Sequence, residues 1–305
     1  MKHKLEYAIV CLLIGLLRIL PLRLGVWVGS LLGRIHYFID ARHRRLTIEH
    51  LQLAYGQAKT LSELKQIARN SYRSQGMSMA ESIYLPRLTL SKIQKWVKID
   101  GLSHYVEAQK RGKGVIILTA HLGNWEIIPK AFWAHSFRIH GTVRPLDNPY
   151  LNRMAKRWRE QNGMGVLNKG ADTHRILKLL REGEAVGFLL DQNTYEEDSV
   201  FVDFFGHEAG THKGVAVLAL RSGAPVVPVF MKREASGHRM MIERPLEWVR
   251  TGSNRNDIVT ATTLFTKTIE SHVKRNPEQW LWIHRRWKTK RSKGAPITQD
   301  RDSNI

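Results

Sequence analysis

The sequence is poor in cysteine and in acidic residues, and both shortages limit what the protein can be. Cys11 is the only cysteine among 305 residues, which excludes an intrachain disulfide and a thiolate zinc finger and favours a reducing compartment. Asp and Glu number 27 against 48 Lys and Arg, so the formal net charge is +21. A surface of this charge attracts phosphates, whether in nucleic acid, anionic lipid or an acidic protein.

The body of the chain also lacks repeats and low-complexity tracts. With 43% hydrophobic and 25% charged residues, the composition is globular and excludes collagen, a coiled coil, a polytopic membrane protein and outright disorder. The length allows one large domain or two small ones.

No long, uninterrupted apolar run is present. Residues 7–17 are apolar throughout, but a charge and Pro21 follow, so the run is shorter than the roughly 20 residues of a straight membrane span. A second apolar stretch, 24–39, ends at a basic cluster at 42–45. A secretory signal, a buried helical hairpin and a membrane anchor all fit this pattern. Because no small-residue cleavage site is evident and flanking cations suit a bilayer interface, we expect residues 1–40 to anchor the protein to a membrane.

The C-terminal stretch 280–293 interleaves tryptophans with Lys and Arg. This mixture suits membrane headgroups and single-stranded nucleic acid. A final helix that packs its tryptophans inward explains the stretch equally well. We expect residues 41–293 to form one domain and residues 294–305 to form a disordered tail.

Strand-like and helix-like segments alternate in the middle of the chain. Three short β-branched runs suit strands buried on both faces, at 114–119, 186–190 and 226–230. Helical stretches lie at 148–161, 171–182 and 213–222. The alternation predicts an α/β fold with a central, mostly parallel sheet flanked by helices, after a helical N-terminal portion. Thr60 and Glu63 resemble a capping box and predict a helix that begins there.

The segment 118–126, LTAHLGNWE, carries the clearest chemistry. His121 follows the first predicted strand, Asn124 is a candidate helix N-cap, and Glu126 falls in the first helical turn. On one continuous helix a five-residue offset separates side chains by about 140°, whereas a strand-to-helix bend brings them together. Because an imidazole beside a carboxylate is a general-base unit, the pattern predicts a short hydrogen bond between His121 and Glu126. An ordinary hydrogen-bonded histidine at a strand end is the simpler alternative.

The base needs a proton donor. No G-x-S-x-G elbow is present, so we expect the base to act on a hydroxyl of a bound substrate. Asn124 and backbone N–H groups at the helix start are candidates for steadying an oxyanion. Asp191 and Gln192 end the strand predicted at 186–190, where they could contact substrate, hold the His121 loop, or make an ordinary turn hydrogen bond. His207 and His212 belong to no tight ligand set, and we predict no metal site.

The HLGNWE motif resembles the H-x-x-x-x-[DE] motif of the lysophospholipid acyltransferase superfamily. Nearly the whole chain resembles one branch, the late lipid A acyltransferases. The supporting blocks, in family order, are VRPLDNP at 143–149, LNKG at 167–170, LDQN at 190–193, FG at 205–206 with AGT at 209–211, the run at 214–230, PEQW at 277–280 and HRRW at 284–287. An EGTRS-like block, usual in glycerophosphate acyltransferases, is missing. A related branch that acylates mannosylated inositol lipids shares the HxxxxE unit.

The resemblance implies roles for individual residues. It identifies His121 and Glu126 as the catalytic pair and associates Arg144 with substrate phosphate. Arg159 and Lys169 are weaker candidates for the same task. A guanidinium after a strand can bind phosphate bidentately, although all three cations also fit an ordinary solvated surface. The family needs no metal and no cofactor.

The resemblance also implies a function. The expected enzyme transfers a fatty acyl chain from an acyl carrier protein thioester to a hydroxyl of a lipid A precursor, at the cytoplasmic face of the bacterial inner membrane. Residues 41–293 would then be the acyltransferase domain. The expected partners are acyl carrier protein, the lipid A precursor and inner-membrane lipids, with no nucleic acid. A glycerophospholipid or other glycolipid acyltransferase is an alternative, and a basic nucleic-acid-binding protein is a more distant one.

Overall fold

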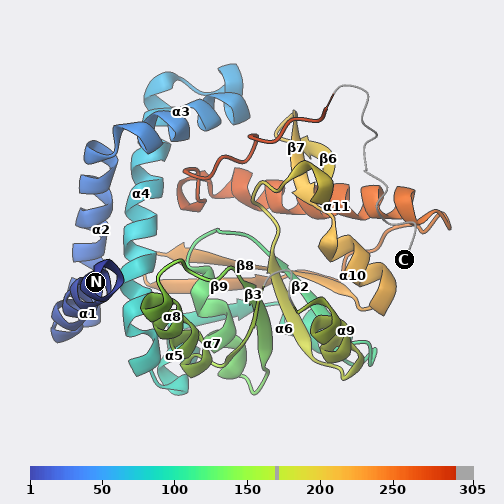
Figure 1. Cartoon of the computed structure of the whole chain (residues 1–305), viewed down its shortest axis with the longest axis horizontal. Coiled ribbons are helices and arrows are strands. Elements are labelled where there is room, and N and C mark those ends of the chain that lie inside the picture. The colour runs from blue at the N-terminus through green and yellow to red at the C-terminus, as the bar shows by residue number, and fades with distance from the viewer. Residues whose placement is uncertain (169–171, 293–305) are drawn as a thin grey trace.

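The core of the protein is a mostly parallel β-sheet. The computed structural model describes residues 1–168 and 172–292, and its main sheet has seven strands in the order β1-β9-β8-β2-β5-β3-β4 (Figure 1). These strands are β1 (Val97–Asp100), β2 (Val115–Thr119), β3 (Ile139–Val143), β4 (Met164–Asn168), β5 (Ala185–Leu189), β8 (Val226–Glu234) and β9 (Gly237–Ile242). The β8–β9 pair is antiparallel, and the other pairs in this sheet are parallel. The predicted α/β class with a mostly parallel central sheet is confirmed.

Helices flank the sheet, and a two-stranded antiparallel ribbon, β6 (Ser199–Phe204) and β7 (His207–His212), lies outside it. The helices are α1 (Lys2–Ile19), α2 (Leu22–Ile39), α3 (Ala41–Tyr55), α4 (Leu61–Tyr84), α5 (Leu90–Trp96), α6 (Leu102–Gln109), α7 (Ile128–Trp133), α8 (Pro149–Gln161), α9 (Thr173–Arg181), α10 (Gly214–Ser222) and α11 (Asn254–Arg275). Helices α8, α9 and α10 confirm the three predicted helical stretches. Strands β2, β5 and β8 confirm the three predicted strands.

The predicted strands are the centre of the sheet. Strand β2 pairs with β5 on one side and β8 on the other, and all of its residues are buried. β-Branched runs suit such positions because both faces of the strand contact helices. The register places Thr119 beside Leu189, so the chain leaves β2 and β5 at the same edge of the sheet.

Helix α4 stands between the N-terminal helices and the sheet (Figure 1). Its N-terminus has the predicted capping box, with Thr60 and Glu63 each accepting from the other's backbone N–H. Helix α2 packs against it through glycines. A Cβ added at Gly29 would lie 2.4 Å from the carbonyl oxygen of Gly76, and one added at Gly33 would lie 2.2 Å from that of Tyr72. The two helices therefore pack backbone against backbone, and a larger residue at either glycine would push them apart.

The N-terminal helices leave much apolar surface uncovered. Helix α1 has no buried residue, and no described helix is long and apolar enough to cross a membrane. The large exposed apolar side chains are Leu5, Ile9, Leu12, Leu13, Leu16 and Ile19 on α1, and Leu24, Trp27, Leu31, Leu32, Ile35, Phe38 and Ile39 on α2.

The C-terminal tryptophans, in contrast, are interior residues. Trp280, Trp282 and Trp287 are at most 5% exposed, so the alternative in which the tryptophans pack inward is confirmed. The segment that carries them is irregular, so the final helix of that alternative is wrong. Burial of these rings removes the main support for the nucleic-acid-binding alternative, because base stacking needs accessible aromatic faces. The predicted tail, 294–305, lies outside the described residues.

Candidate active site

His121 lies just past the end of β2, and its carboxylate partner is Asp191. Asp191 lies two residues past β5, and Leu190 N–H donates to the Thr119 carbonyl at 3.1 Å, which extends the β2–β5 pairing to this point. One oxygen of Asp191, Oδ1, lies 2.8 Å from His121 Nδ1. The other, Oδ2, accepts from the His121 backbone N–H at 2.9 Å. Asp191 thus fixes both the ring and the backbone of His121, which confirms the alternative that it holds the His121 loop.

The carboxylate of Asp191 is buried and remains an acceptor. Only 2% of the residue is exposed, and Trp280 Nε1–H donates a further hydrogen bond to Oδ2 at 2.7 Å. Burial raises the pKa of Asp191, but the charge of His121 and the three hydrogen bonds outweigh burial and lower that pKa overall. An ionised acceptor next to Nδ1 favours the tautomer with the proton on Nδ1.

The other ring nitrogen of His121 faces a more open environment. Nε2 lies 3.3 Å from the amide nitrogen of Gln192, and the His121 side chain is 18% exposed. The Trp125 ring packs edge-on against the imidazole at 4.7 Å between centroids. With Nδ1 protonated, Nε2 accepts from the Gln192 amide. The ring has the geometry of a general base for a bound hydroxyl that takes the place of this amide at Nε2.

Glu126 does not make the hydrogen bond predicted for it. Residues Trp125–Ile127 form a 3₁₀ turn, and Glu126 pairs with Arg159 of α8. Arg159 Nη2 donates to Oε1 at 2.6 Å, and Arg159 Nε donates to Oε2 at 3.2 Å. Within the described chain, the carboxylate bonded to His121 belongs to Asp191, so the predicted short His121–Glu126 bond is wrong. The catalytic role of Glu126 itself stays a prediction.

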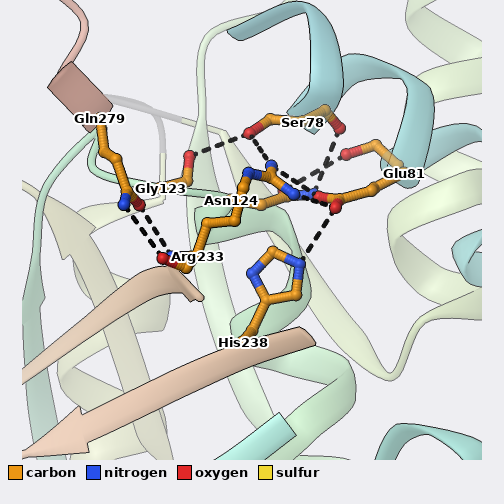
Figure 2. A network of polar contacts seen from close by, with 8 residues as sticks. Ser78, Glu81, Gly123, Asn124, Arg233, His238 and Gln279 are labelled. Atoms are coloured by element: carbon orange, nitrogen blue, oxygen red, sulfur yellow. Dashed lines mark hydrogen bonds and ion pairs between the residues drawn. The ribbon is translucent and has the colours of Figure 1, made fainter. Parts of the chain in front are cut away.

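Asn124 anchors the turn that follows His121. It is 1% exposed, and its amide donates to the Ser78 carbonyl at 3.2 Å and to Glu81 Oε2 at 2.9 Å, both on α4 (Figure 2). Asn124 occupies the N-cap position of the 3₁₀ turn, as predicted, but its side chain makes no capping hydrogen bond there. Because both amide hydrogens are used in these bonds, the geometry gives Asn124 a role in supporting the turn rather than in contacting an oxyanion.

Glu81 is the centre of a buried polar network behind the turn. Arg233 of β8 forms a two-pronged ion pair with it, and His238 Nε2 of β9 lies 3.2 Å from Oε1 (Figure 2). Burial raises the pKa of Glu81, but the bond and charge of His238 and the charge of Arg233 outweigh it and lower the pKa to about 2. Glu81 is thus an ionised, fully paired carboxylate between α4 and the sheet. No sequence pattern singled it out, because its partners come from distant segments.

The backbone of this turn also contacts α4, β8 and the segment at Gln279, through Gly123. Gly123 has a φ of +59°, and a Cβ there would lie 2.2 Å from the Met231 carbonyl oxygen. Its N–H donates to the Gln279 carbonyl at 3.0 Å, and its carbonyl accepts from Ser78 Oγ at 3.2 Å. Only glycine fits this position, so the LGN segment is a tightly held turn and not a mobile loop.

Comparison with known proteins identifies the family of this site. The profile described as bacterial lipid A biosynthesis acyltransferase matches residues 2–289. The chain belongs to this family. The chain is 30% identical over 274 residues to the lipid A biosynthesis palmitoleoyltransferase of Escherichia coli K12, covering 89% of this chain and 87% of the relative. It is 27% identical to the lauroyltransferase of the same organism, over 88% and 86% of the two chains. A phosphatidylinositol mannoside acyltransferase of Mycolicibacterium smegmatis is 23% identical over 72% of each chain.

In this lipid A acyltransferase, the remaining cations predicted to bind substrate are Arg144 and Lys169. Arg144 is exposed in the loop after β3. The same loop is tied to α1, because Asn148 Nδ2 donates to the His3 carbonyl and to Glu6 Oε2, both at 2.9 Å. Lys169 lies outside the described residues. On α8, three other cations, Arg153, Lys156 and Arg157, are exposed.

A second imidazole lies close to the His121–Asp191 pair of the acyltransferase. Nδ1 of His284 is buried and has no hydrogen-bond partner within the described chain. Burial lowers the pKa of His284 to about 4, while the charges of Asp191 and His121 act on it in opposite directions. His284 is therefore neutral at physiological pH, and it adds no charge beside the active histidine.

Proposed function

We propose that this lipid A acyltransferase moves an acyl chain from an acyl carrier protein thioester to a hydroxyl of a 3-hydroxyacyl chain on the lipid A precursor. His121 is the general base, and no cofactor takes part. The observation that carries the proposal is the 2.8 Å contact between His121 Nδ1 and the buried Asp191 carboxylate, with Nε2 on a partly exposed ring.

In the proposed reaction the acceptor hydroxyl gives its proton to His121 Nε2. Asp191 holds the proton on Nδ1 and stabilises the cation that forms. The alkoxide attacks the thioester carbonyl, so a C–O bond forms, the C–S bond breaks, and the imidazolium returns the proton to the leaving thiolate. The thioester supplies the driving force. Backbone N–H groups at the start of the 3₁₀ turn are the proposed oxyanion donors, since the Asn124 side chain is used elsewhere.

Glu126 remains in the proposed catalytic set, now through Arg159. The guanidinium uses Nε and Nη2 for Glu126, which leaves Nη1 to bind a substrate oxygen. A carboxylate that fixes a guanidinium in this way presents it to phosphate in one orientation. Arg144, Lys169 and Gln192 remain proposed contacts of the substrate.

The proposed setting is the cytoplasmic face of the inner membrane. Exposed apolar side chains cover α1 and α2, and the contacts of Asn148 with α1 place the Arg144 loop beside this apolar surface. Substrate phosphates would then meet the arginines while acyl chains stay near the bilayer. The net charge of +21 suits docking of an acidic acyl carrier protein.

A reconstituted transfer assay tests the proposal. Wild-type protein, acyl carrier protein loaded with an acyl chain, and purified lipid A precursor should give one added acyl ester by mass spectrometry. His121→Ala should lower the rate at least roughly a hundredfold, because a general base typically contributes this much or more. Transfer at the wild-type rate by His121→Ala would contradict the mechanism. Faster acylation of lysophospholipid than of the lipid A precursor would favour the glycerophospholipid alternative.

A further inference from the structure

A cavity of about 210 Å³ lies between α2 and α4, away from the His121 site. Its lining includes Arg34 of α2, Arg69 and Arg73 of α4, and the aromatic rings of Tyr37 and Phe38. Three arginines from two helices thus line one hollow. Helices α2 and α4 lie on the side of the molecule formed by the N-terminal helices (Figure 1). The reaction proposed above uses none of these residues.

The three arginines are not neutralised by the protein. Within residues 1–168 and 172–292, none of them forms an ion pair with Asp or Glu, and the one hydrogen bond of their side chains runs from Arg73 Nε to Ser30 Oγ at 3.2 Å. Elsewhere, Arg159 and Arg233 each pair with a carboxylate. Like charges repel, so three unpaired guanidiniums around one cavity form a site that an anion stabilises.

The cavity adjoins an apolar stripe on α2. Trp27, Leu31, Ile35 and Phe38 follow one another at spacings of three and four residues, which places them on one face of the helix. All four are exposed, Trp27 by 61% and Phe38 by 65%. The glycines that pack on α4 occupy the opposite face. Phe38 belongs to both the stripe and the cavity lining, so apolar and cationic surfaces meet at one edge of α2.

We propose that this cavity binds the phosphate of an anionic membrane phospholipid while the stripe on α2 lies among the acyl chains. The inference rests on the proposed membrane location and adds to it a specific site. A planar guanidinium matches phosphate oxygens bidentately. The apolar stripe favours an anionic lipid over an acidic protein or a nucleic acid as the ligand, because only a lipid has hydrocarbon chains next to its phosphate.

Vesicle binding by a charge-deficient variant tests the site. Full-length wild-type protein is compared with the triple variant Arg34→Gln, Arg69→Gln, Arg73→Gln on phosphatidylglycerol vesicles and on phosphatidylcholine vesicles. A basic residue at an anionic surface strengthens binding about fivefold, so removal of three lowers the partition coefficient into phosphatidylglycerol roughly a hundredfold. Binding to phosphatidylcholine should change by less than about threefold, because the stripe is intact.

A matched control separates a local site from the general positive charge. Arg175→Gln, Arg181→Gln and Arg221→Gln remove the same charge from α9 and α10, which lie on the side of the molecule away from α2 (Figure 1). The control should bind phosphatidylglycerol as wild type does. Equal loss in both triple variants, or no loss in the cavity variant, would overturn the proposal. Loss of acyl carrier protein binding by the cavity variant, with vesicle binding intact, would overturn it in favour of a protein partner.

Failure of this inference is distinguishable from failure of the proposed function. Acyl transfer to detergent-dispersed lipid A precursor should be the same in wild type and in the cavity variant, because the cavity is separate from His121. Vesicle binding needs no acyl donor. A wild-type protein without transfer activity would therefore refute the reaction while leaving the binding comparison valid.

Discussion

Two buried carboxylates, Asp191 and Glu81, contact the segment 121–124, Asp191 through His121 and Glu81 through Asn124. They differ in what else they contact. Asp191 and Glu81 are each about 2% exposed, and both have pKa values lowered by their partners although burial acts in the other direction. Asp191 bonds to a histidine that is partly open to solvent. Glu81 bonds to Arg233, His238 and Asn124, which lie between α4 and the sheet (Figure 2).

The difference separates two uses of the same chemical group. Asp191 acts through a ring whose second nitrogen can exchange a proton with a bound molecule, so its charge affects reactivity. Glu81 has charged and amide partners on every side, so its charge holds backbone segments together. Removal of the Asp191 charge should therefore lower activity more than stability. Removal of the Glu81 charge should lower stability more than activity.

The largest effect is expected at Asp191. Asp191→Asn keeps the shape but removes the charge that stabilises the His121 cation and fixes its tautomer. Acyl transfer should fall at least roughly a hundredfold, similar to His121→Ala. The change is measured as kcat with saturating donor and acceptor, and unaltered near-ultraviolet circular dichroism serves as the control for folding. A variant with wild-type kcat would show that Asp191 is as purely structural as Glu81.

The next test concerns Glu126, the carboxylate that the HxxxxE spacing predicted as the partner of His121. Glu126→Ala should lower transfer roughly tenfold to a hundredfold, because Arg159 loses the hydrogen bonds to a charged group, worth about 1.5–3 kcal/mol, that fix its orientation. If it acts by holding Arg159, the double variant with Arg159→Ala should be little worse than either single variant, because the two side chains work as a unit. Additive losses in kcat/KM would refute this coupling. Retained activity in Glu126→Ala would remove Glu126 from the catalytic set.

The choice between Glu126 and Asp191 shows where sequence reasoning succeeds and where it fails. The strand before His121 and the strand before Asp191 are both visible as short β-branched runs, and both were predicted. Their adjacency depends on the β2–β5 register, in which Thr119 lies beside Leu189. A spacing pattern within six residues cannot report a contact 70 residues away. It favoured Glu126 instead, which the 3₁₀ turn carries to α8.

The two ends of the chain also show a contact pattern that the sequence alone does not predict. Both combine apolar side chains with cations, and composition alone suggested similar surfaces. The structure exposes the apolar residues of α1 and α2 but buries Trp280, Trp282 and Trp287. Trp287 Nε1–H, for example, donates to the Phe204 carbonyl at 3.2 Å. Burial of these rings depends on tertiary packing against β6, which no local pattern encodes.

Glu81 should show the opposite balance from Asp191. Glu81→Gln leaves Arg233 buried without its counter-charge, which typically costs about 3–5 kcal/mol of the free energy of unfolding. Chemical denaturation at pH 7 measures this loss, and kcat of the folded fraction should fall by less than about tenfold. A variant of normal stability that lacks activity would place Glu81 in the chemistry instead.

The pH dependence of the stability lost in Glu81→Gln tests whether Glu81 is ionised in the folded protein. The pKa of Glu81 is about 2 in the folded protein, against an ordinary value of 4.5. A lowered pKa stabilises the fold above the ordinary value, and this contribution disappears as pH falls from about 4.5 towards 2. The stability difference between wild type and Glu81→Gln should therefore shrink as pH falls below 4.5. A difference that stays constant down to pH 3 would contradict the ionised assignment.

The smallest effect is expected at Trp280. Its uncharged ring bonds to Asp191, the carboxylate that we assign to catalysis. Trp280→Phe removes the 2.7 Å hydrogen bond to Asp191 Oδ2 and keeps most of the packing. A hydrogen bond to a charged group is worth about 1.5–3 kcal/mol, but Asp191 keeps both bonds to His121. We therefore expect stability to fall by about 1–2 kcal/mol, and kcat to fall severalfold. A loss as large as that of Asp191→Asn would mean that Trp280, and not the carboxylate alone, sets the orientation of His121.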